Sequence, residues 1–263
     1  MDSNSQTPGL TLTSEGNFAW LTLDRPEKRN ALSQAMWQGL PGLIARFEGG
    51  SAKVLIVRGA GGHFAAGADI SEFESVYATR ASTQAYFSAV AAGMSALATC
   101  AKPTLAQIEG ACVGGGLGLA LCCDLRLAAE GARLGITPGK LGLMYSLDDT
   151  RRLVEAVGPQ LAKDILYTGR ILEASEALDR GLILSLHAPT ELEAAVLAKA
   201  GAIAQASQWS ARKSKSIIGK ILDGQSGEDA TTAGWMLDAV ALEDFAEGRA
   251  AFLEKRAPNF PFR

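Results

Sequence analysis

The sequence predicts a mixed α/β fold in which an α/β core is followed by a helical extension. Strand-like apolar runs alternate with helical segments over the N-terminal half, whereas the C-terminal third reads almost entirely as helix. No shift in composition and no Ser/Gly-rich linker marks a second folding unit. We therefore expect one continuous unit, with the core over residues 1–200 and the helical region over residues 201–263.

Short apolar runs bounded by turn residues indicate the core strands. These runs are residues 17–23, 53–58, 104–108, 125–129 and 182–187. Helical patterns cover residues 82–98, 117–123, 161–167, 191–205, 212–222 and 231–245. Residues 1–8 read as a loose tail, and Asn30 is expected to cap a helix that begins at Ala31 and that Pro41 should break or kink.

Composition and charge exclude several classes of protein. The chain has 263 residues, of which 48% are hydrophobic and 20% charged, an ordinary globular mixture with a sizeable core. The formal net charge of -3 gives no electrostatic reason to expect nucleic acid or an anionic membrane as a partner. The N-terminus is polar, and charged or polar residues interrupt every apolar stretch, so we expect a cytoplasmic protein.

Four cysteines lie in apolar sequence, at Cys100, Cys112, Cys122 and Cys123. No pair of them has the spacing of zinc ligands. They are expected to be reduced core thiols, as is usual in a cytosolic protein. No metal site is predicted.

The most informative stretch runs from residue 102 to residue 124. An apolar strand is followed by a turn, by the successive glycines Gly114, Gly115 and Gly116, and by an almost wholly apolar segment. The first N–H groups of a helix have no internal partner and carry partial positive charge, and glycine lets a ligand approach the backbone. This layout indicates an anion-binding turn, and a tight turn before a core helix is the alternative.

Five motifs then give a family resemblance. They are LDRPEKRNAL at 23–32, VLIVRGAGGHFAAGADISEF at 54–73, KPTLAQIEGACVGGGLGLALCCDLRLA at 102–128, TGRILEASEALDRGLI at 168–183 and EGRAAFLEKRAPNF at 247–260. In this order and spacing they resemble the crotonase (enoyl-CoA hydratase/isomerase) superfamily. The resemblance implies a spiral of repeated β-β-α turns, a C-terminal helical trimerisation region, and assembly as a homotrimer or a dimer of trimers. It also implies acyl-CoA substrates without a separate cofactor, because coenzyme A is part of the substrate.

By the same resemblance, the backbone N–H groups of Ala68 and Gly115 form an oxyanion hole for the thioester carbonyl. Chemistry beside a thioester passes through an enolate, whose negative charge such donors stabilise. Small residues suit positions that contribute only their backbone. The resemblance further implies contacts with the substrate or its coenzyme A moiety by Lys28, Arg29, Ala66, Asp69, Ile70, Phe252 and Lys255.

Two positions depart from the family pattern. Hydratases of this family use two glutamates to activate water, and the matching positions here hold Gly118 and Pro138. Neither residue can perform acid–base chemistry. The replacement candidates lie in the connection that follows: Tyr145, Asp148 and Asp149. For Asp149, capping of the following helix is the alternative.

Three hypotheses on function remain open. The first is an acyl-CoA enzyme with isomerase-like chemistry, which needs a single acid–base group and tolerates the missing glutamates. The second is a decarboxylase of a malonyl-type thioester, which a carboxylate-binding Tyr145 would favour. The third is an acyl-CoA binding protein without catalysis. A dehydrogenase and an α/β-hydrolase are excluded, because the chain lacks G-x-G-x-x-G after a strand and lacks G-x-S-x-G.

Overall fold

The computed structural model describes residues 5–262. Its strands are β1 (Ser5–Thr7), β2 (Leu10–Glu15), β3 (Phe18–Leu23), β4 (Val54–Gly59), β5 (Thr104–Ile108), β6 (Ala111–Val113), β7 (Leu125–Ala129), β8 (Arg133–Gly135), β9 (Ile171–Glu173) and β10 (Ser185–His187). Its α-helices are α1 (Gln34–Gly49), α2 (Phe73–Val76), α3 (Arg80–Ala98), α4 (Gly115–Leu121), α5 (Leu147–Thr168), α6 (Ala174–Asp179), α7 (Leu192–Gln205), α8 (Gln208–Leu222), α9 (Ala230–Ala241) and α10 (Glu243–Glu254). The predicted α/β class is confirmed.

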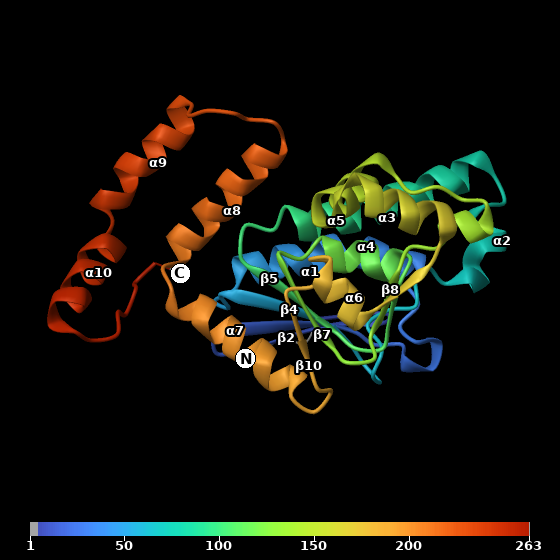
Figure 1. The fold of residues 1–263 in the computed structure, drawn as a ribbon, viewed down its shortest axis with the longest axis horizontal. Coiled ribbons are helices and arrows are strands. Elements are labelled where there is room, and N and C mark those ends of the chain that lie inside the picture. Colours follow the sequence, from blue (N-terminus) through green and yellow to red (C-terminus); the bar gives the residue numbers. More distant parts are fainter. Residues whose placement is uncertain (1–4, 263) are drawn as a thin grey trace.

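The strands form two sheets. The larger has the order β1-β2-β3-β4-β5-β7-β10, with β1 to β3 antiparallel and β3 to β10 parallel. The smaller joins β6 in parallel to β8, and β8 antiparallel to β9. The chain thus repeats a pattern in which a strand of the large sheet is followed by a short strand and a helix, as β5, β6 and α4 illustrate; β5 and α4 are labelled in Figure 1. The expected strands 104–108 and 125–129 are confirmed at both ends.

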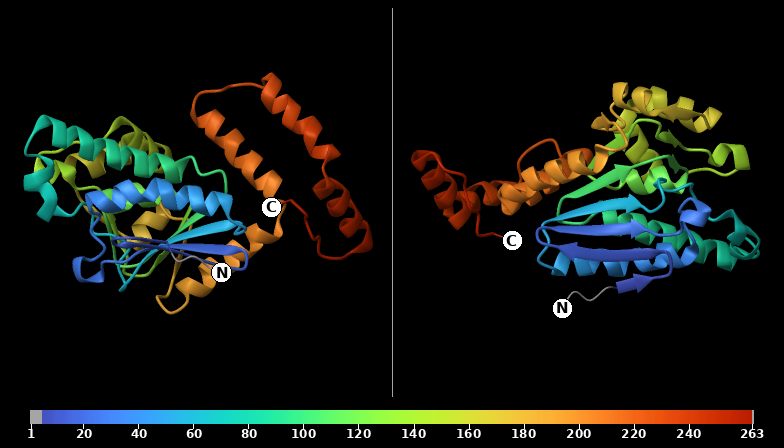
Figure 2. Two further views of the ribbon diagram at one scale, coloured as in Figure 1. Left: turned by 180° about the vertical axis from the view of Figure 1, so that it is seen from behind. Right: turned by 90° about the horizontal axis from the view of Figure 1, so that it is seen from below.

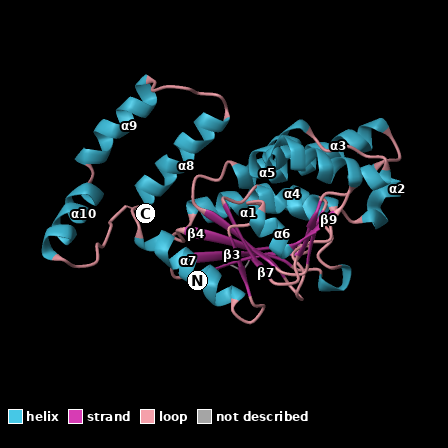
Figure 3. Cartoon of the chain, in the orientation of Figure 1, coloured by secondary structure: helices cyan, strands magenta, loops and turns pink. Residues whose placement is uncertain are grey.

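Helices cover both faces of the large sheet (Figure 3). On one face, α1, α3 and α4 pack over apolar side chains such as Leu21, Leu55 and Ile108, in the main hydrophobic core. On the other face, α7 packs over a second cluster that includes Ile56 and Leu105. Because successive side chains of a strand point to opposite faces, continuously apolar strands such as β4 and β5 supply both clusters.

The last three helices leave this body as an arm, which we define as α8 to α10 (Figures 1 and 2). The boundary expected between residues 200 and 201 falls inside α7, which packs on the sheet. The expectation of one helix over 231–245 is wrong, because Leu242 is extended and separates α9 from α10. Within residues 5–262, no helix has both the length and the apolar character needed to cross a bilayer.

Three expectations near the N-terminus need correction. Residues 5–7 of the supposed tail form β1, which pairs with β2, whereas residues 1–4 lie outside the described part. Helix α1 begins at Gln34 with Ser33 as its N-cap, and it runs through Pro41 without a break. Asn30 instead adopts a positive φ and donates through its amide to the carbonyls of Ala60 and His63.

Lys102 fixes the far end of α1 against the sheet. Its side chain is buried, and its ammonium donates to the carbonyl oxygens of Phe47, Gly50 and Ala52 at 3.1, 2.7 and 2.8 Å. The same ammonium lies 5.0 Å from the centre of the Phe47 ring. A cation at the C-terminal end of a helix also complements the helix dipole. One buried lysine therefore ties the last turn of α1, at Phe47, to the segment that follows the helix, at Gly50 and Ala52.

We expect the substitution Lys102→Met to lower the free energy of unfolding by about 2–3 kcal/mol, because three carbonyls, two of them buried, lose a charged donor. Urea denaturation followed by circular dichroism measures this. The control is Lys199→Met on the exposed surface of α7, for which a change within about 0.5 kcal/mol is expected. Equal stability of the two variants would contradict the role assigned to Lys102.

Candidate active site

Two backbone segments that contain glycine, the loop before Ala68 and the turn that opens α4, lie against each other. A Cβ placed on Gly67 would lie 3.1 Å from the Val113 carbonyl oxygen and 3.8 Å from the Gly115 nitrogen. A Cβ placed on Gly114 would lie 3.6 Å from the Gly67 Cα. Gly67 and Gly114 both have positive φ, which side chains disfavour. The glycines therefore allow the loop before Ala68 to touch the turn that opens α4.

The direction of the Ala68 N–H follows from its neighbours. Leu32 N donates to Gly67 O at 2.7 Å, and Asp69 N donates to Leu32 O at 2.9 Å. Ala68 forms a parallel bridge with Leu32, so its own N–H and carbonyl point to the opposite side of the segment. That side faces the Gly114–Gly115 turn. Within residues 5–262, the Ala68 N–H has no hydrogen-bond partner.

Gly115 is the first residue of α4, and its N–H has no partner in the described part of the chain. The segment before it is held in place on both sides. Val113 N donates to Ala65 O at 2.9 Å, and Gly114 N donates to Gly135 O at 2.8 Å. The structure thus brings the two predicted oxyanion donors into adjacent segments, and both N–H groups remain open.

Tyr145 lies beside the position where hydratases carry their first glutamate. A Cβ on Gly118 would lie 3.7 Å from the Tyr145 hydroxyl oxygen and 2.8 Å from Cε of Met94. The hydroxyl is buried and has no hydrogen-bond partner among residues 5–262. Burial, and secondly the nearby charge of Asp149, raises the pKa of Tyr145 above its ordinary value. This phenol is therefore neutral and free to donate.

The two aspartates differ in their surroundings. Asp148 is exposed in the first turn of α5, whereas the Asp149 side chain is only 12% exposed. Asp149 accepts from the Ser146 hydroxyl at 2.6 Å and pairs with Arg152 at 3.2 Å. The alternative interpretation of Asp149 as a helix cap is wrong, because Ser146 is the N-cap and accepts from the Asp149 N–H. Pro138, at the second glutamate position, opens a short 3₁₀ turn.

The predicted contacts with coenzyme A fall into two groups in space. The first group lies in or against the loop that carries Ala68: Ala66, Asp69 and Ile70 belong to this loop, and Lys28 and Arg29 contact it. Ala66 and Ile70 are exposed, whereas Asp69 is buried and paired with both Lys28 and Arg25.

Phe252 and Lys255 belong to the second group. They lie at the end of α10, at the far end of the arm from α4 (Figure 1). Both are exposed. Within one chain the structure does not bring them to the N–H groups of Ala68 and Gly115.

Sequence reasoning missed three residues around these groups. Met94 of α3 faces Gly118, Ser71 donates to Asp69, and Arg25 pairs with Asp69. Only its place in the motif at 23–32 could have indicated a role for Arg25. Met94 sits within an Ala-rich helix and carried no signal.

The cysteines and the possible metal ligands offer no alternative site. All four cysteines are buried and free, as expected, and burial raises the pKa of Cys100 to about 11 and that of Cys122 to about 12. Such thiols stay protonated and are poor nucleophiles. The described residues contain no group of three or more His, Cys, Asp or Glu side chains that could hold a metal ion.

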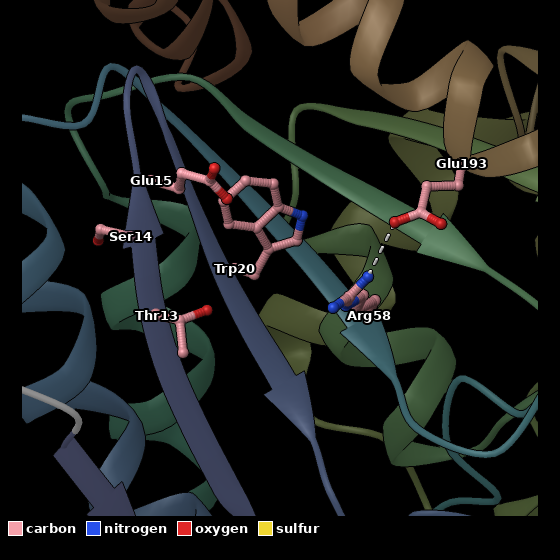
Figure 4. A pocket seen from close by; sticks show the side chains of 6 residues that line it. All are labelled: Thr13, Ser14, Glu15, Trp20, Arg58 and Glu193. Atoms are coloured by element: carbon pink, nitrogen blue, oxygen red, sulfur yellow. Dashed lines mark hydrogen bonds and ion pairs between the residues drawn. The ribbon is translucent and has the colours of Figure 1, made fainter. Parts of the chain in front are cut away.

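A polar cavity of about 310 Å³ lies elsewhere, on the face of the large sheet that α7 covers (Figure 4). Residues of β2, together with Trp20, line it, and Arg58 pairs with Glu193 at 3.3 Å beside the Trp20 ring. It lies across the sheet from α1 and α4. This cavity is therefore separate from the oxyanion donors.

Comparisons with known proteins place the chain in a family. The family model described as Enoyl-CoA hydratase/isomerase matches residues 13–262. The crotonyl-CoA hydratase of Syntrophomonas wolfei is 33% identical over 258 residues, which cover 95% of this chain and 97% of that protein.

Two solved structures are similar throughout. An enoyl-CoA hydratase/isomerase family protein from Hyphomonas neptunium has a TM-score of 0.94 and 46% identity, and the match covers 97% of this chain and 98% of that one. An enoyl-CoA hydratase/carnithine racemase from Magnetospirillum magneticum has a TM-score of 0.93 and 34% identity, over 98% and 97% of the two chains.

Two glycines of α4 give a matched pair of predictions. A Cβ on Gly116 would overlap the backbone carbonyl of Ala65, so Gly116→Ala should cost at least about 2 kcal/mol of unfolding free energy. A Cβ on Gly118 meets the flexible end of Met94, and Gly118→Ala should stay within about 1 kcal/mol of the wild type. Thermal and urea unfolding measure both. Equal losses would contradict the close approach of the Ala65 segment to α4.

Proposed function

Because the chain belongs to the enoyl-CoA hydratase/isomerase family of the crotonase superfamily, we propose that it converts an acyl-CoA thioester by stabilising the thioester enolate. The observation that carries this is the pair of N–H groups of Ala68 and Gly115, which lie in adjacent segments and have no partner among residues 5–262. Their position, fixed by backbone hydrogen bonds and by glycines, is the preorganisation that oxyanion stabilisation requires.

The energy that these donors supply is large enough to matter. Removing one oxyanion donor costs about 2.7–4 kcal/mol in a well-studied protease, so two donors account for several kcal/mol of the barrier. The donors act on charge that develops at the carbonyl oxygen as the enolate forms. They therefore favour any reaction that passes through an enolate, and the neighbouring side chains select among such reactions.

Addition of water is disfavoured by the residues present. Gly118 has no carboxylate, and Pro138 has none at the second position. Met94 and Tyr145 occupy the space beside Gly118. A hydratase of this family needs carboxylates there to hold and activate water, and this chain offers an apolar side chain and a phenol.

Isomerase-like chemistry is the reaction that we favour. Migration of a double bond requires removal of one proton from the carbon beside the thioester and its return two carbons further along. A single acid–base group can carry out both steps. Asp149 is the candidate for this group, because its charge acts on the Tyr145 hydroxyl, and Tyr145 can donate to the negative charge that spreads along the acyl chain.

Decarboxylation of a malonyl-type thioester is the second candidate, which the state of Tyr145 favours. Loss of CO2 leaves its electron pair on the adjacent carbon and generates the enolate without a base. A neutral phenol that has no partner among residues 5–262 can donate a hydrogen bond to the substrate carboxylate, or lie beside the carbon that is protonated afterwards. In this candidate Asp149 has no chemical role.

The test compares three thioesters: crotonyl-CoA, a 3-enoyl-CoA and methylmalonyl-CoA, each incubated with the purified protein and followed by mass spectrometry. We expect migration of the double bond in the 3-enoyl-CoA and little hydration of crotonyl-CoA. The variant Tyr145→Phe should lower turnover about 100-fold, the order of an acid–base contribution. Its stability should be unchanged or slightly higher, because the lost hydroxyl had no partner.

The control is Tyr167→Phe at the exposed end of α5, which should leave turnover and stability unchanged. Loss of CO2 from methylmalonyl-CoA would select the second candidate. Rapid hydration of crotonyl-CoA would contradict the consequence drawn from Gly118 and Pro138. Binding of all three thioesters without turnover would support the third hypothesis, a protein that binds acyl-CoA without catalysis.

We also propose that the chain assembles as a homotrimer or a dimer of trimers. The arm carries large exposed apolar side chains, at Met236, Leu237, Val240, Phe245, Phe252 and Leu253. Exposed apolar surface on a projecting element is a common mark of an association surface. Lys255, if it contacts coenzyme A, does so for a neighbouring chain, because its own active site lies at the other end of the molecule (Figure 1).

Light scattering on the purified protein should give three or six times the chain mass of 27.5 kDa. We expect Leu237→Glu to dissociate the assembly, because a charge would be buried at the interface. The control Lys199→Glu, on the exposed surface of α7, should leave the mass unchanged. A monomeric wild-type protein would contradict the proposed assembly.

A further inference from the structure

A buried charge cluster lies directly beside the first oxyanion donor. Asp69 follows Ala68 in the chain and is only 6% exposed. Its Oδ2 atom pairs with Arg25 Nη2 at 2.8 Å and with Lys28 Nζ at 2.9 Å. Its Oδ1 atom accepts from the Ser71 hydroxyl at 2.6 Å and from the Ser71 N–H at 3.2 Å. Both carboxylate oxygens are thus fully engaged.

The charges in this cluster stay fixed over the ordinary range of pH. Burial alone would raise the pKa of Asp69, but the hydrogen bonds from Ser71 and from the two cations outweigh it and hold the pKa well below its ordinary value. Asp69 is therefore ionised in the folded protein at any pH used for assay. A lowered pKa means that the cluster stabilises the fold above the ordinary carboxyl pKa and loses this contribution only in strong acid.

The cluster is linked to the Ala68 N–H through a short chain of bonds. Arg25 also donates to Ala31 O at 2.7 Å, next to the Leu32 segment that pairs with Ala68. Leu32 in turn holds Gly67 and Asp69, the residues on either side of Ala68. The backbone alone leaves the loop attached to Leu32 by two hydrogen bonds. The carboxylate of Asp69 adds the side-chain attachment that fixes the loop to the turn at residues 25–28.

We propose that Asp69 is a positioning residue, which orients the Ala68 N–H by tying its loop to Arg25 and Lys28. This inference rests on the proposed function, because it assigns Asp69 a role in the oxyanion site. It differs from the expectation of a direct contact between Asp69 and the substrate, since the carboxylate is buried and all its partners belong to the protein.

Lys28 has a second consequence for binding. Its side chain is 41% exposed, and its ammonium also donates to Ser71 at 3.0 Å. The predicted contact of Lys28 with a coenzyme A phosphate competes with its bond to Asp69. Loss of the Asp69 charge should therefore release Lys28 toward the phosphate and loosen the loop that carries Ala68. Binding of the phosphate should then strengthen, and binding of the thioester carbonyl should weaken.

The test measures dissociation constants of two probes by isothermal titration calorimetry. Coenzyme A has no acyl carbonyl, whereas acetoacetyl-CoA has a carbonyl that forms a stable enolate. The wild type should prefer acetoacetyl-CoA. The variant Asp69→Asn keeps the shape but loses the charge, and it should lose about tenfold of this preference. Its affinity for coenzyme A should be unchanged or rise. A purely structural role would lower the melting temperature and leave the preference intact.

Two further variants make the result decisive. Ser71→Ala removes the hydrogen bond from the Ser71 hydroxyl to Asp69 but keeps the one from the Ser71 N–H and every charge, and it should lose a smaller part of the same preference. If Asp69→Asn fails to fold, Ser71→Ala still tests the positioning role of Asp69. Glu193→Gln breaks the exposed pair with Arg58 across the sheet and should change neither affinity (Figure 4).

An unchanged preference in a folded Asp69→Asn protein would overturn the inference, as would an unchanged preference in Ser71→Ala if only that variant folds. A wild type that binds both probes equally would overturn the oxyanion assignment itself, and with it the proposed function. The two failures are therefore distinguishable, because only the second appears in the unmodified protein.

Discussion

The structure depends on the contact between two glycine backbones, Gly67 and Gly114. The absence of side chains lets the Ala68 loop lie against the turn that opens α4, and the positive φ of both glycines turns the chain at that point. Strand β6 and the bridge at Ala65 hold the two segments in register. A side chain on Gly67 or Gly116 would crowd the neighbouring backbone, and one on Gly114 would have to adopt an unfavourable positive φ, so these small residues are a geometric requirement of the site.

Polar bonds hold the same loop from its other side. Asn30 donates to two carbonyls of the segment after β4, and Arg29 and Asn30 both adopt positive φ, an uncommon conformation for side chains other than glycine. Such strain persists only where surrounding contacts impose it. The turn at residues 25–30 is therefore a second fixed frame, which connects the buried Asp69 to the start of α1. The close backbone contact of the glycines thus holds one side of the Ala68 loop, and hydrogen bonds and ion pairs hold the other.

Much of this could be predicted from local sequence, and the exceptions share a cause. Strands β5 and β7 were predicted to the residue, because a buried parallel strand is a continuous apolar run. Asn30 was misassigned as a cap because its amide serves a contact with residues about thirty positions away, which local pattern does not reveal. The motifs indicate Ala68 and Gly115, and the connection after them offers Tyr145, but neither the burial of the Tyr145 hydroxyl against Gly118 nor the partners of Asp69 could be predicted from spacing.

Gly118 stands where hydratases of this family carry a glutamate, and this difference changes the polarity of the whole site as well as removing one carboxylate. A glutamate would bring a charge that needs partners in a buried site. Met94 and the phenol of Tyr145 fill that space instead, so the site beside the oxyanion donors is neutral apart from the charge of Asp149 at some distance. A neutral wall cannot activate water, yet it raises the strength of the two N–H donors, because lower polarity strengthens electrostatic bonds. The absence of a carboxylate beside Gly118 therefore fits the two proposed reactions, isomerisation with a single acid–base group and decarboxylation without a base, better than it fits hydration.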